Sequence, residues 1–535
     1  MASPQLIREI ERRRTFAIIS HPDAGKTTLT EKLLLYSGLI QSAGLVKNRK
    51  GRKATSDWMG MEQERGISIT SSAMQFPYKG QMINVLDTPG HQDFSEDTYR
   101  TLTAADSAIM VLDAAKGVEM QTRKLFDVCR LRGIPILTFI NKLDMPGRDP
   151  LDLLTELEGA LGVQACAFNW PVGSGRDFRG VVDRRANELQ LFTKTASGGA
   201  KMSALERIPV ESREFEERLG SQLADKVRGE LELLEVAGNQ YDHEAFLAGR
   251  VTPAFFGSAL TNFGLEPFFD AFVEMAPSPY ARQVTKDDET KMMVEPTEEF
   301  SAFVFKIQAN MDRRHRDCIA FLRICSGSFE ADTLVHHHRL NKMVRLNRPH
   351  SVVAQSRSTL DEAYAGDVVG LISRDMFHIG DTISSGGGFR HKALPMFQPE
   401  LFARIAPTST SLRKRFDKGM RNLIAEGAIQ RFTPEMGADM LIGAFGRLQL
   451  EVLQYRLDDE YGVETHLTYL PYQCSAWLKD QKLKFNAPTT SLVTRDDRVR
   501  MVILFLDKGE KRSAAKMTPT TPSSISPSSQ HPPSE

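Results

Sequence analysis

Between residues 15 and 276 the chain alternates short apolar runs with stretches whose apolar residues recur at helical spacing. Strands that alternate with helices indicate a parallel sheet covered by helices on both faces. The runs are apolar almost throughout, which is typical of strands buried on both sides. For residues 1–280 the pattern therefore predicts an α/β fold with a mostly parallel sheet. Its expected strands are TFAIIS (15–20), MINVLD (82–87), AIMVLD (108–113), PILTFIN (135–141) and PAFFGS (253–258).

Two departures from this alternation are expected. The run ISITSSAMQF (67–76) reaches MINVLD through Lys79-Gly80, which predicts a hairpin and an antiparallel edge strand. Two expected loops are separated by residues 145–257. This segment is far longer than the roughly 30 residues of one strand–helix–strand step. The surplus, residues 160–250, is rich in charge and predicts an inserted, mostly helical subdomain. Its charged helix is more typical of a solvated face than of a docking face.

The remainder of the chain shows three further patterns. Residues 281–299 are charged and contain proline, and we expect a linker there. Short runs with turn signals predict a small β-barrel at 300–395, of the translation-factor type by the resemblance described below. From 396 to 510, the order strand-helix-strand-strand-helix-strand predicts a ferredoxin-like α+β domain. Residues 511–535 are rich in Pro, Ser and Thr and predict a disordered tail.

Composition narrows the classes of function. The 535 residues carry 68 Lys+Arg and 68 Asp+Glu, so zero formal net charge argues against coating nucleic acid by charge alone. The five cysteines are scattered without a CxxC pair, which argues for a reducing compartment and against a zinc site. The sequence shows neither an apolar run of the roughly 18 residues that span a bilayer nor a signal peptide. We therefore expect a cytoplasmic protein with no membrane partner.

A triple histidine, 336–338, lies in an expected barrel strand. Alternate residues of a strand face opposite sides, so only His336 and His338 would share a face. We expect surface or nucleic-acid contact there rather than a metal site.

The junction between the first strand and the first helix reads SHPDAGKT. A glycine-containing turn at this place aims backbone N–H groups and the positive end of the helix dipole at one point, which suits a phosphate. Lys26 would reach the β- and γ-phosphates, and the Thr27 hydroxyl would ligate Mg²⁺. Ser20 replaces the first glycine of the pattern GxxxxGK[ST], so this loop alone is equally consistent with a plain turn. The candidate residues are Ser20, His21, Pro22, Asp23, Ala24, Gly25, Lys26 and Thr27.

The second loop reads DTPGH and follows the strand MINVL. Asp87 would lie at the carboxyl end of that strand, where ligands of open α/β sheets bind, and its carboxylate could hold Mg²⁺ through water. Gly90 allows the backbone to approach a γ-phosphate. His91 would orient the attacking water. The candidates here are Asp87, Thr88, Pro89, Gly90 and His91.

The third loop, NKLD, predicts selection of guanine. The Asp144 carboxylate would accept hydrogen bonds from guanine N1–H and N2–H₂, donors that adenine lacks. Asn141 would brace the loop, and the Lys142 stem can lie over the base. A backbone N–H at Ser258-Ala259 could meet guanine O6. The candidates are Asn141, Lys142, Leu143, Asp144, Ser258 and Ala259.

A further hydroxyl in RGISIT (65–70) could bind Mg²⁺ only while a γ-phosphate holds the loop, which makes a two-state switch. Ser68 is the candidate by position and Thr70 is the alternative. Together the loops predict a GTPase that uses GTP, GDP and Mg²⁺. The rivals are a general P-loop ATPase or nucleotide kinase, against which Asp144 argues, and a non-hydrolysing GTP sensor, against which His91 argues.

The motifs SHPDAGKTT, EQERGISIT, DTPGHQDFSEDTYRTL, DAAKGVE and NKLD resemble those of the translational GTPases, such as elongation factor G. Three finer stretches, FSEDTYRTLTAADSAIMVLDAAKGVE, WPVGSGRDFRGVVD and FVFKIQANMDRRHRD, resemble the bacterial class-II peptide-chain release factors. The resemblance covers about residues 5–505. Ser68 departs from the threonine common in the group, and the low-complexity end after Gly509 departs from a structured final segment.

This resemblance implies a ribosome-dependent GTPase that promotes dissociation and recycling of class-I release factors after stop-codon-directed peptide release. Ribosomal RNA, through the sarcin-ricin loop, would draw His91 toward the attacking water. The partners would be the ribosome and the class-I release factors, and the chain would be a monomer. A translocase, a back-translocase and a ribosome-protection factor are the sibling alternatives, against which only the finer motifs and the chain length argue.

Overall fold

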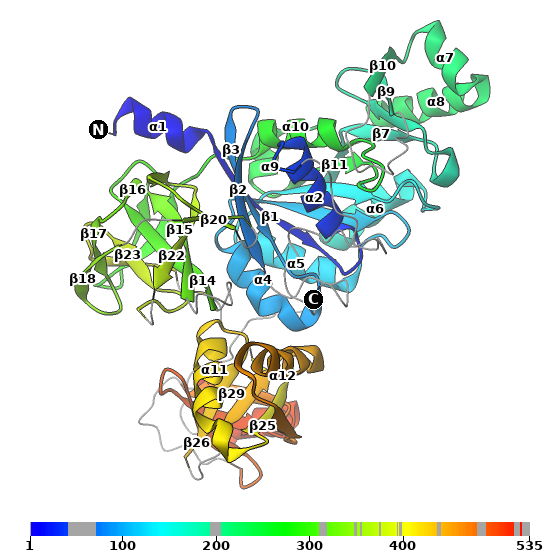
Figure 1. The fold of residues 1–535 in the computed structure, drawn as a ribbon. Helices are drawn as coiled ribbons and strands as arrows, with labels where there is room; N and C mark the ends of the chain where they lie inside the picture. The colour runs from blue at the N-terminus through cyan, green and yellow to red at the C-terminus, as the bar shows by residue number, and fades with distance from the viewer. Residues whose placement is uncertain are drawn as a thin grey trace.

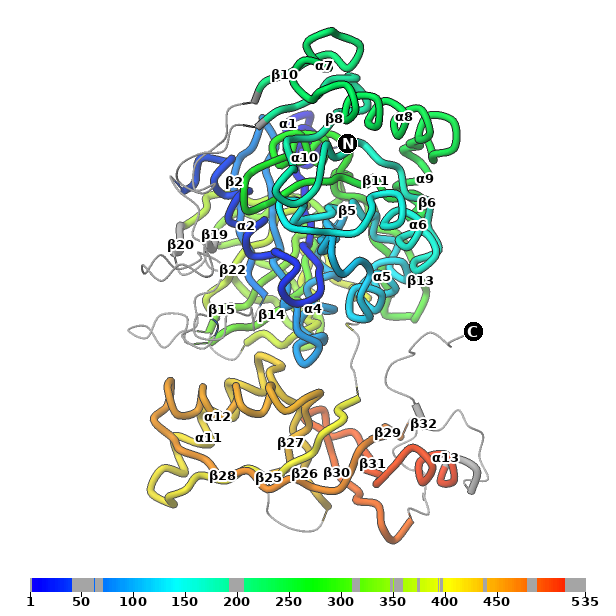
Figure 2. The backbone as a smooth tube through the Cα atoms, turned by 90° about the vertical axis from the view of Figure 1, so that its right-hand side faces the viewer, coloured from blue at the N-terminus to red at the C-terminus, as the bar shows by residue number. Residues whose placement is uncertain are grey.

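The fold is known from a computed structural model. It describes residues 2–40, 62, 71–192, 205–309, 318–346, 350–353, 356–373, 376–392, 394, 398–435, 440–478, 488–517 and 525–526. Figure 1 shows a central α/β domain, an all-β domain beside it and an α+β domain below. Figure 2, turned by 90°, shows the third domain lying below the other two.

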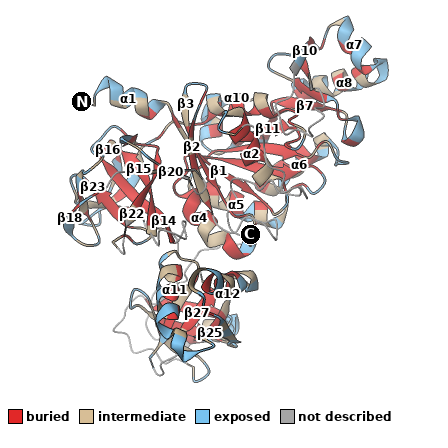
Figure 3. Cartoon of the chain, in the orientation of Figure 1, coloured by how far each residue is buried: buried red, intermediate tan, exposed pale blue. Residues whose placement is uncertain are grey.

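The α/β domain is built on a seven-stranded sheet of order β2-β3-β1-β4-β5-β11-β6. Every neighbouring pair is parallel except β2 with β3. Successive residues of β1 enter two different cores, because Ala17 and Ile19 pack on one face and Phe16 and Ile18 on the other. The predicted burial on both faces is therefore confirmed (Figure 3). The strands are β1 (Arg13–Ser20), β3 (Gln81–Asp87), β4 (Ser107–Asp113), β5 (Ile136–Asn141), β6 (Gln164–Ala167) and β11 (Val251–Phe256).

The predicted hairpin is also present. Strand β2 (Ser72–Tyr78) pairs antiparallel with β3 through a turn at Lys79 and Gly80, whose φ values are 45° and 81°. The first part of the predicted strand, residues 67–70, lies outside the described residues. The helices of this domain are α1 (Pro4–Glu11), α2 (Lys26–Tyr36), α4 (Ser95–Leu102), α5 (Met120–Leu131), α6 (Pro150–Leu161), α9 (His243–Leu247) and α10 (Leu265–Met275), with the 3-10 turn η1 (Gln92–Phe94).

The expectation of a mostly helical insertion is wrong for its first half. After β6 joins the main sheet, the chain forms a separate antiparallel sheet of order β10-β9-β8-β7, and two helices follow (Figure 1). The strands have only four or five residues each, too short for their alternation to stand out beside the long charged helix. The elements are β7 (Asn169–Val172), β8 (Gly180–Asp183), β9 (Glu188–Phe192), β10 (Leu205–Pro209), α7 (Arg213–Leu219) and α8 (Ser221–Ala237), with the 3-10 turn η2 (Gly175–Asp177).

The segment predicted as a linker is also structured. Strands β12 (Arg282–Lys286) and β13 (Lys291–Val294) form a hairpin, and β12 pairs with β24 (Phe389–His391) from the far end of the all-β domain. Val284 and Val294 of this small sheet face inward, whereas the charged residues around its turn, from Lys286 to Lys291, are exposed.

The all-β domain holds an antiparallel sheet of order β18-β17-β23-β14-β15-β22-β19-β20 and a short β16-β21 pair. Buried ion pairs fix this domain against the α/β domain. The fully buried Asp106 accepts hydrogen bonds from Arg282 at 2.8 Å and Arg323 at 2.6 Å. The strands are β14 (Ser301–Ala309), β15 (Cys318–Ser326), β16 (Ser328–Glu330), β17 (Leu334–His337), β18 (Lys342–Arg345), β19 (His350–Val353), β20 (Ser356–Thr359), β21 (Glu362–Tyr364), β22 (Val368–Ser373) and β23 (Thr382–Ser384).

The triple histidine differs from the expected surface contact, because its middle member is the buried one. His337 is fully buried, stacks on Phe377 and places Nε2 3.2 Å from Asp381 Oδ2. Arg339 also binds Asp381 through two hydrogen bonds of 2.7 and 2.9 Å. Because β17 pairs with β18 and β23, the face of β17 that carries His337 points into the domain core. The sequence alone does not specify these pairing partners.

This buried cluster predicts acid sensitivity of the all-β domain. Burial raises the pKa of Asp381, but His337, Arg339 and a backbone N–H outweigh it and lower the pKa to about 2. The ionised carboxylate therefore contributes stability that is complete above its ordinary value of 3.8 and is lost as pH falls toward 2. Relative to the unchanged chain, Asp381→Asn should lower the urea midpoint at pH 7, and this difference should stay constant down to about pH 4 and shrink as pH falls from there toward 2. An equal change from Asp332→Asn, on an exposed turn, would contradict this.

The third domain confirms the ferredoxin-like prediction. Its elements follow the predicted order, and four strands lie in the order β28-β25-β27-β26, all neighbours antiparallel. The sheet continues into β30-β31-β29-β32, and α13 packs on β29 and β31. The elements are β25 (Leu401–Pro407), α11 (Arg413–Ala425), β26 (Gln430–Pro434), β27 (Leu441–Ala444), α12 (Arg447–Tyr461), β28 (Thr465–Tyr469), β29 (Cys474–Leu478), β30 (Leu492–Asp496), β31 (Met501–Phe505), α13 (Lys508–Met517) and β32 (Ile525–Ser526), with the 3-10 turn η3 (Thr410–Leu412).

Helix α13 corrects the predicted start of the tail at residue 511, because it continues to Met517 and buries Ala514. The rest of the predicted tail, apart from 525–526, lies outside the described residues. Within the described part of the chain, no helix is long and apolar enough to cross a membrane.

Candidate nucleotide site

The first predicted loop lies between the end of β1 at Ser20 and the start of α2 at Lys26. Asp23 and Gly25 have φ values of 65° and 98°, which turn the chain sharply into the helix. Only glycine fits at 25, because a Cβ there would collide with Asn141 Nδ2 and the backbone is left-handed. The remaining loop residues line the same turn, with His21 and Ala24 buried, Asp23 exposed, and Pro22 and Thr27 half-buried.

The second predicted loop lies directly against the first. Lys26 Nζ donates a hydrogen bond of 2.5 Å to Asp87 Oδ1 at the end of β3, and both side chains are buried. Thr88 Oγ1 donates to the Ile18 carbonyl of β1 at 2.7 Å. A Cβ on Gly90 would lie 3.5 Å from the Pro22 backbone, so the two loops are in close contact, and Pro89 is buried behind them. The predicted lysine and carboxylate therefore form one buried ion pair between the two loops.

The third and fourth loops are joined to the first by one side chain. Asn141 Nδ2 donates to the Ala24 carbonyl at 2.8 Å, and Asn141 Oδ1 accepts from the Ala259 backbone N–H at 2.8 Å. Asn141 is 2% exposed, so these hydrogen bonds are shielded from water. Asn141 thus joins the first loop to the loop at Ala259, which is the kind of contact that the predicted bracing role requires.

The expected guanine acceptor lies beside this brace. Asp144 Oδ1 accepts a hydrogen bond of 2.6 Å from Ser258 Oγ, while Leu143 is buried beneath the loop. Lys142 has a φ of 70° and donates to Asp113 Oδ2 at 2.8 Å. Burial raises the pKa of Asp113, but the Lys142 bond and the Ala115 N–H outweigh it and hold that pKa below its usual range. The ionised Asp113 carboxylate therefore holds the Lys142 ammonium group and with it the position of the side chain.

His91 follows the second loop and begins the η1 turn. Its Nδ1 accepts a hydrogen bond of 3.2 Å from the Asp93 backbone N–H, and about a third of its side chain (33%) is exposed. The ring is therefore fixed at one nitrogen while part of it remains open to solvent.

Two residues at this site were not predicted from the sequence. Glu119 places Oε2 2.9 Å from His21 Nε2, and Asp113 holds Lys142 as described. Burial lowers the pKa of His21 despite Glu119, so this ring is neutral near pH 7. Both acids belong to the motif DAAKGVE. The resemblance of this motif to the translational GTPases could have pointed to them. Ser68 and Thr70, the candidate switch hydroxyls, lie outside the described residues.

Comparisons with known proteins identify the family of each domain. Residues 11–278 match the elongation factor Tu GTP binding domain, 299–386 match elongation factor G domain 2, and 391–515 match the class II release factor RF3, C-terminal domain. A crystal structure of a Thermus thermophilus protein aligns with a TM-score of 0.69, covering 90% of this chain and 72% of that one. At 23% identity this likeness concerns the fold alone.

Curated relatives extend over nearly the whole chain and carry the name peptide chain release factor 3. One from Synechocystis is 53% identical and covers 89% of this chain and 87% of its own length. Another from Nostoc punctiforme is 51% identical, with 94% and 93% covered, and one from Symbiobacterium thermophilum is 50% identical, with 96% and 97% covered. The chain therefore belongs to the peptide chain release factor 3 family and is a translational GTPase of termination.

Proposed function

We propose that the four loops bind GTP with Mg²⁺ and that the chain uses GTP hydrolysis on the ribosome to release and recycle class-I release factors. The observation that carries this proposal is the Asn141 brace, which joins the Gly25-Lys26 loop, the Asp144 loop and the Ala259 backbone into one site. The buried Asn141 side chain thereby fixes the loop proposed to bind phosphate relative to the loops proposed to bind the base. The family relationship supports the termination role.

The donors present suit a magnesium ion. Asp87 and Thr27 offer a carboxylate and a hydroxyl oxygen at adjacent loops, and Mg²⁺ prefers oxygen ligands from one or two such groups plus phosphates. Among the described residues, no three His, Cys, Asp or Glu side chains gather as a metal cage, which fits an ion bound together with a nucleotide. The ion would neutralise charge on the phosphates. Lys26, which pairs with Asp87 in the structure, would bind the β- and γ-phosphates.

We assign the guanine-binding role to Asp144, and this gives a direct prediction. Asp144→Asn replaces an acceptor by an amide whose NH₂ faces guanine donors, so GTP affinity should fall by about 1–3 kcal/mol, or roughly five- to a hundred-and-fiftyfold. Xanthosine triphosphate carries a carbonyl at C2, to which the amide can donate, and should bind the variant better than GTP does. Competition with labelled GDP measures both affinities. Equal displacement by ATP and GTP from the unchanged chain would contradict the assignment.

The proposed partners are the ribosome, including the sarcin-ricin loop of its RNA, and the class-I release factors, with the chain acting as a cytoplasmic monomer. Turnover of a class-I factor on post-termination ribosomes tests this. We expect GTP and this chain together to stimulate recycling, and neither alone to do so. Stimulated translocation in place of recycling would assign the chain to a different branch of translational GTPases.

A further inference from the structure

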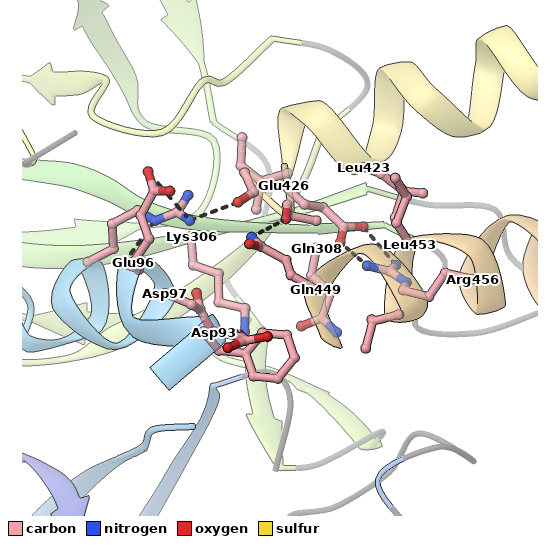
Figure 4. A pocket seen from close by; sticks show the side chains of 16 residues that line it. Asp93, Glu96, Asp97, Lys306, Gln308, Leu423, Glu426, Gln449, Leu453 and Arg456 are labelled. Carbon is pink, nitrogen blue, oxygen red and sulfur yellow. Dashed lines mark hydrogen bonds and ion pairs between the residues drawn. The ribbon is translucent and has the colours of Figure 1, made fainter. Parts of the chain in front are cut away.

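The strongest feature outside the nucleotide loops is a junction at which all three domains meet. Its walls come from η1 and α4 of the α/β domain, β14 of the all-β domain, and α11 and α12 of the ferredoxin-like domain. A cavity of about 60 Å³ remains at its centre, enough for a few water molecules. Figure 4 shows charged side chains from each domain pointing toward this space.

One contact connects this junction to His91. Asp93 Oδ2 accepts a hydrogen bond of 2.9 Å from the Leu448 backbone N–H at the start of α12, while the Asp93 backbone N–H donates to His91 Nδ1 at 3.2 Å. Asp93 is 7% exposed, so both bonds are shielded from water. A single residue therefore binds the candidate catalytic ring on one side and another domain on the other.

Helix α12 depends on Asp93 for its N-terminal cap. Its N-cap position is Gly446, which has no side chain, and its first turn, Arg447 to Leu450, contains no acid. The first backbone N–H groups of a helix need acceptors, and a carboxylate placed there is also favoured by the helix dipole. Asp93 supplies that carboxylate from the α/β domain, and an apolar contact between Phe94 and Val452 lies beside it.

Further contacts reinforce the docking of the two domains. Arg100 donates to the Gly427 carbonyl at 2.9 Å, and Gln430 donates to Glu96 at 3.5 Å. The α4 carboxylate Asp97 binds both the N–H and the hydroxyl of Ser71, and Lys306 of β14 lies 3.6 Å away. The segment that follows His91 is thus held from two sides when the ferredoxin-like domain is docked.

Two groups of Asp93 face the same nitrogen of the His91 ring. The Asp93 backbone N–H lies 3.2 Å from Nδ1, and the Asp93 carboxylate oxygen Oδ1 lies 3.5 Å from it. The docked arrangement therefore holds the His91 ring in one orientation through Nδ1.

We propose that Asp93 is a positioning residue that couples docking of the ferredoxin-like domain to the resting orientation of His91. The proposal rests on the GTPase function proposed above and adds a restraint to it. Breaking the Asp93–Leu448 contact frees the η1 turn, so His91 samples other orientations without the ribosome. Domain movement on the ribosome would relieve the same restraint.

The test measures GTP hydrolysis by the full chain without ribosomes. Asp93→Ala removes the cap, and because the lost bond involves a charged acceptor, the ribosome-free rate should rise by about tenfold. Asp93→Asn keeps an oxygen for the Leu448 N–H and should remain close to the unchanged chain. Asp458→Ala, an exposed acid-to-alanine change near the other end of α12, is the matched control.

A second variant breaks the contact from the other side. A Cβ on Gly446 would overlap the Asp93 carboxylate, while the extended backbone of Gly446 (φ −153°) accepts alanine. Gly446→Ala should raise the rate as Asp93→Ala does, and the two changes combined should add little, because they remove the same contact. Both gains should vanish in a His91→Ala background, which a purely structural role of Asp93 does not require.

Two outcomes separate this inference from the proposed function. If the unchanged chain hydrolyses GTP with ribosomes in a His91-dependent way, but neither Asp93→Ala nor Gly446→Ala changes the ribosome-free rate, the coupling is wrong and the function stands. A gain that persists without His91 also overturns the coupling. If ribosomes do not stimulate the unchanged chain at all, the proposed function fails first.

Discussion

Replacement of Lys26 by alanine is expected to abolish nucleotide retention. Lys26 Nζ lies 2.5 Å from the buried Asp87 carboxylate, so the change removes the cation proposed to bind the phosphates and leaves that carboxylate without this partner. Breaking a buried ion pair costs about 3–5 kcal/mol, and a loss of this size in binding corresponds to roughly two hundred- to five thousandfold weaker affinity. Equilibrium titration with fluorescent GDP and GTP measures the effect.

Lys124→Ala is the matched control for this change, because Lys124 is an exposed lysine on α5. It should bind both nucleotides like the unchanged chain. Since loss of Lys26 also perturbs a buried pair, the thermal unfolding of the variant is followed in parallel. A folded Lys26→Ala chain that retains nucleotide would refute the assignment of the first loop as the phosphate site.

The second large effect is expected at His91. His91→Ala should lower ribosome-stimulated GTP hydrolysis by about 10²–10⁴-fold, the range in which a positioned acid or base contributes to catalysis. Nucleotide affinity should stay unchanged, because we propose that Lys26 binds the phosphates and that Asp144 binds the base. Single-turnover phosphate release with saturating ribosomes separates the chemical step from binding.

His243→Ala provides a control on an exposed histidine of α9, remote in sequence from the loops. It should leave the stimulated rate intact. If the His91→Ala variant releases phosphate at the rate of the unchanged chain, His91 takes no part in the reaction. Another group must then orient the attacking water.

Much of the α/β domain follows from short-range patterns. The apolar runs form β1, β3, β4, β5 and β11 as predicted, because a strand buried on both faces needs apolar residues at nearly every position. The loops at the ends of these strands meet because the carboxyl ends of parallel strands lie at one edge. Gly25 and Asn141 could therefore be placed at one site from the sequence, and they do lie together.

The errors have a common cause. The insertion sheet, the β12-β13 hairpin and the buried His337 all depend on pairing partners, and pairing decides which face of a short strand turns inward. Strands of four or five residues carry too few positions for their own alternation to settle this. The length of α13 was missed because low-complexity sequence begins within it.

The sequence by itself determined the main strands of the α/β domain, the four loops between its elements and the residue types that suit a guanine nucleotide, because these depend on neighbours within a few residues. Tertiary structure alone decided that Asp106 binds Arg323, 217 residues away, and that Asp93 caps a helix 355 residues further along the chain. Such contacts join groups whose local sequences are ordinary. They exist only because the three domains pack against one another, and no periodicity within any one of them encodes that placement.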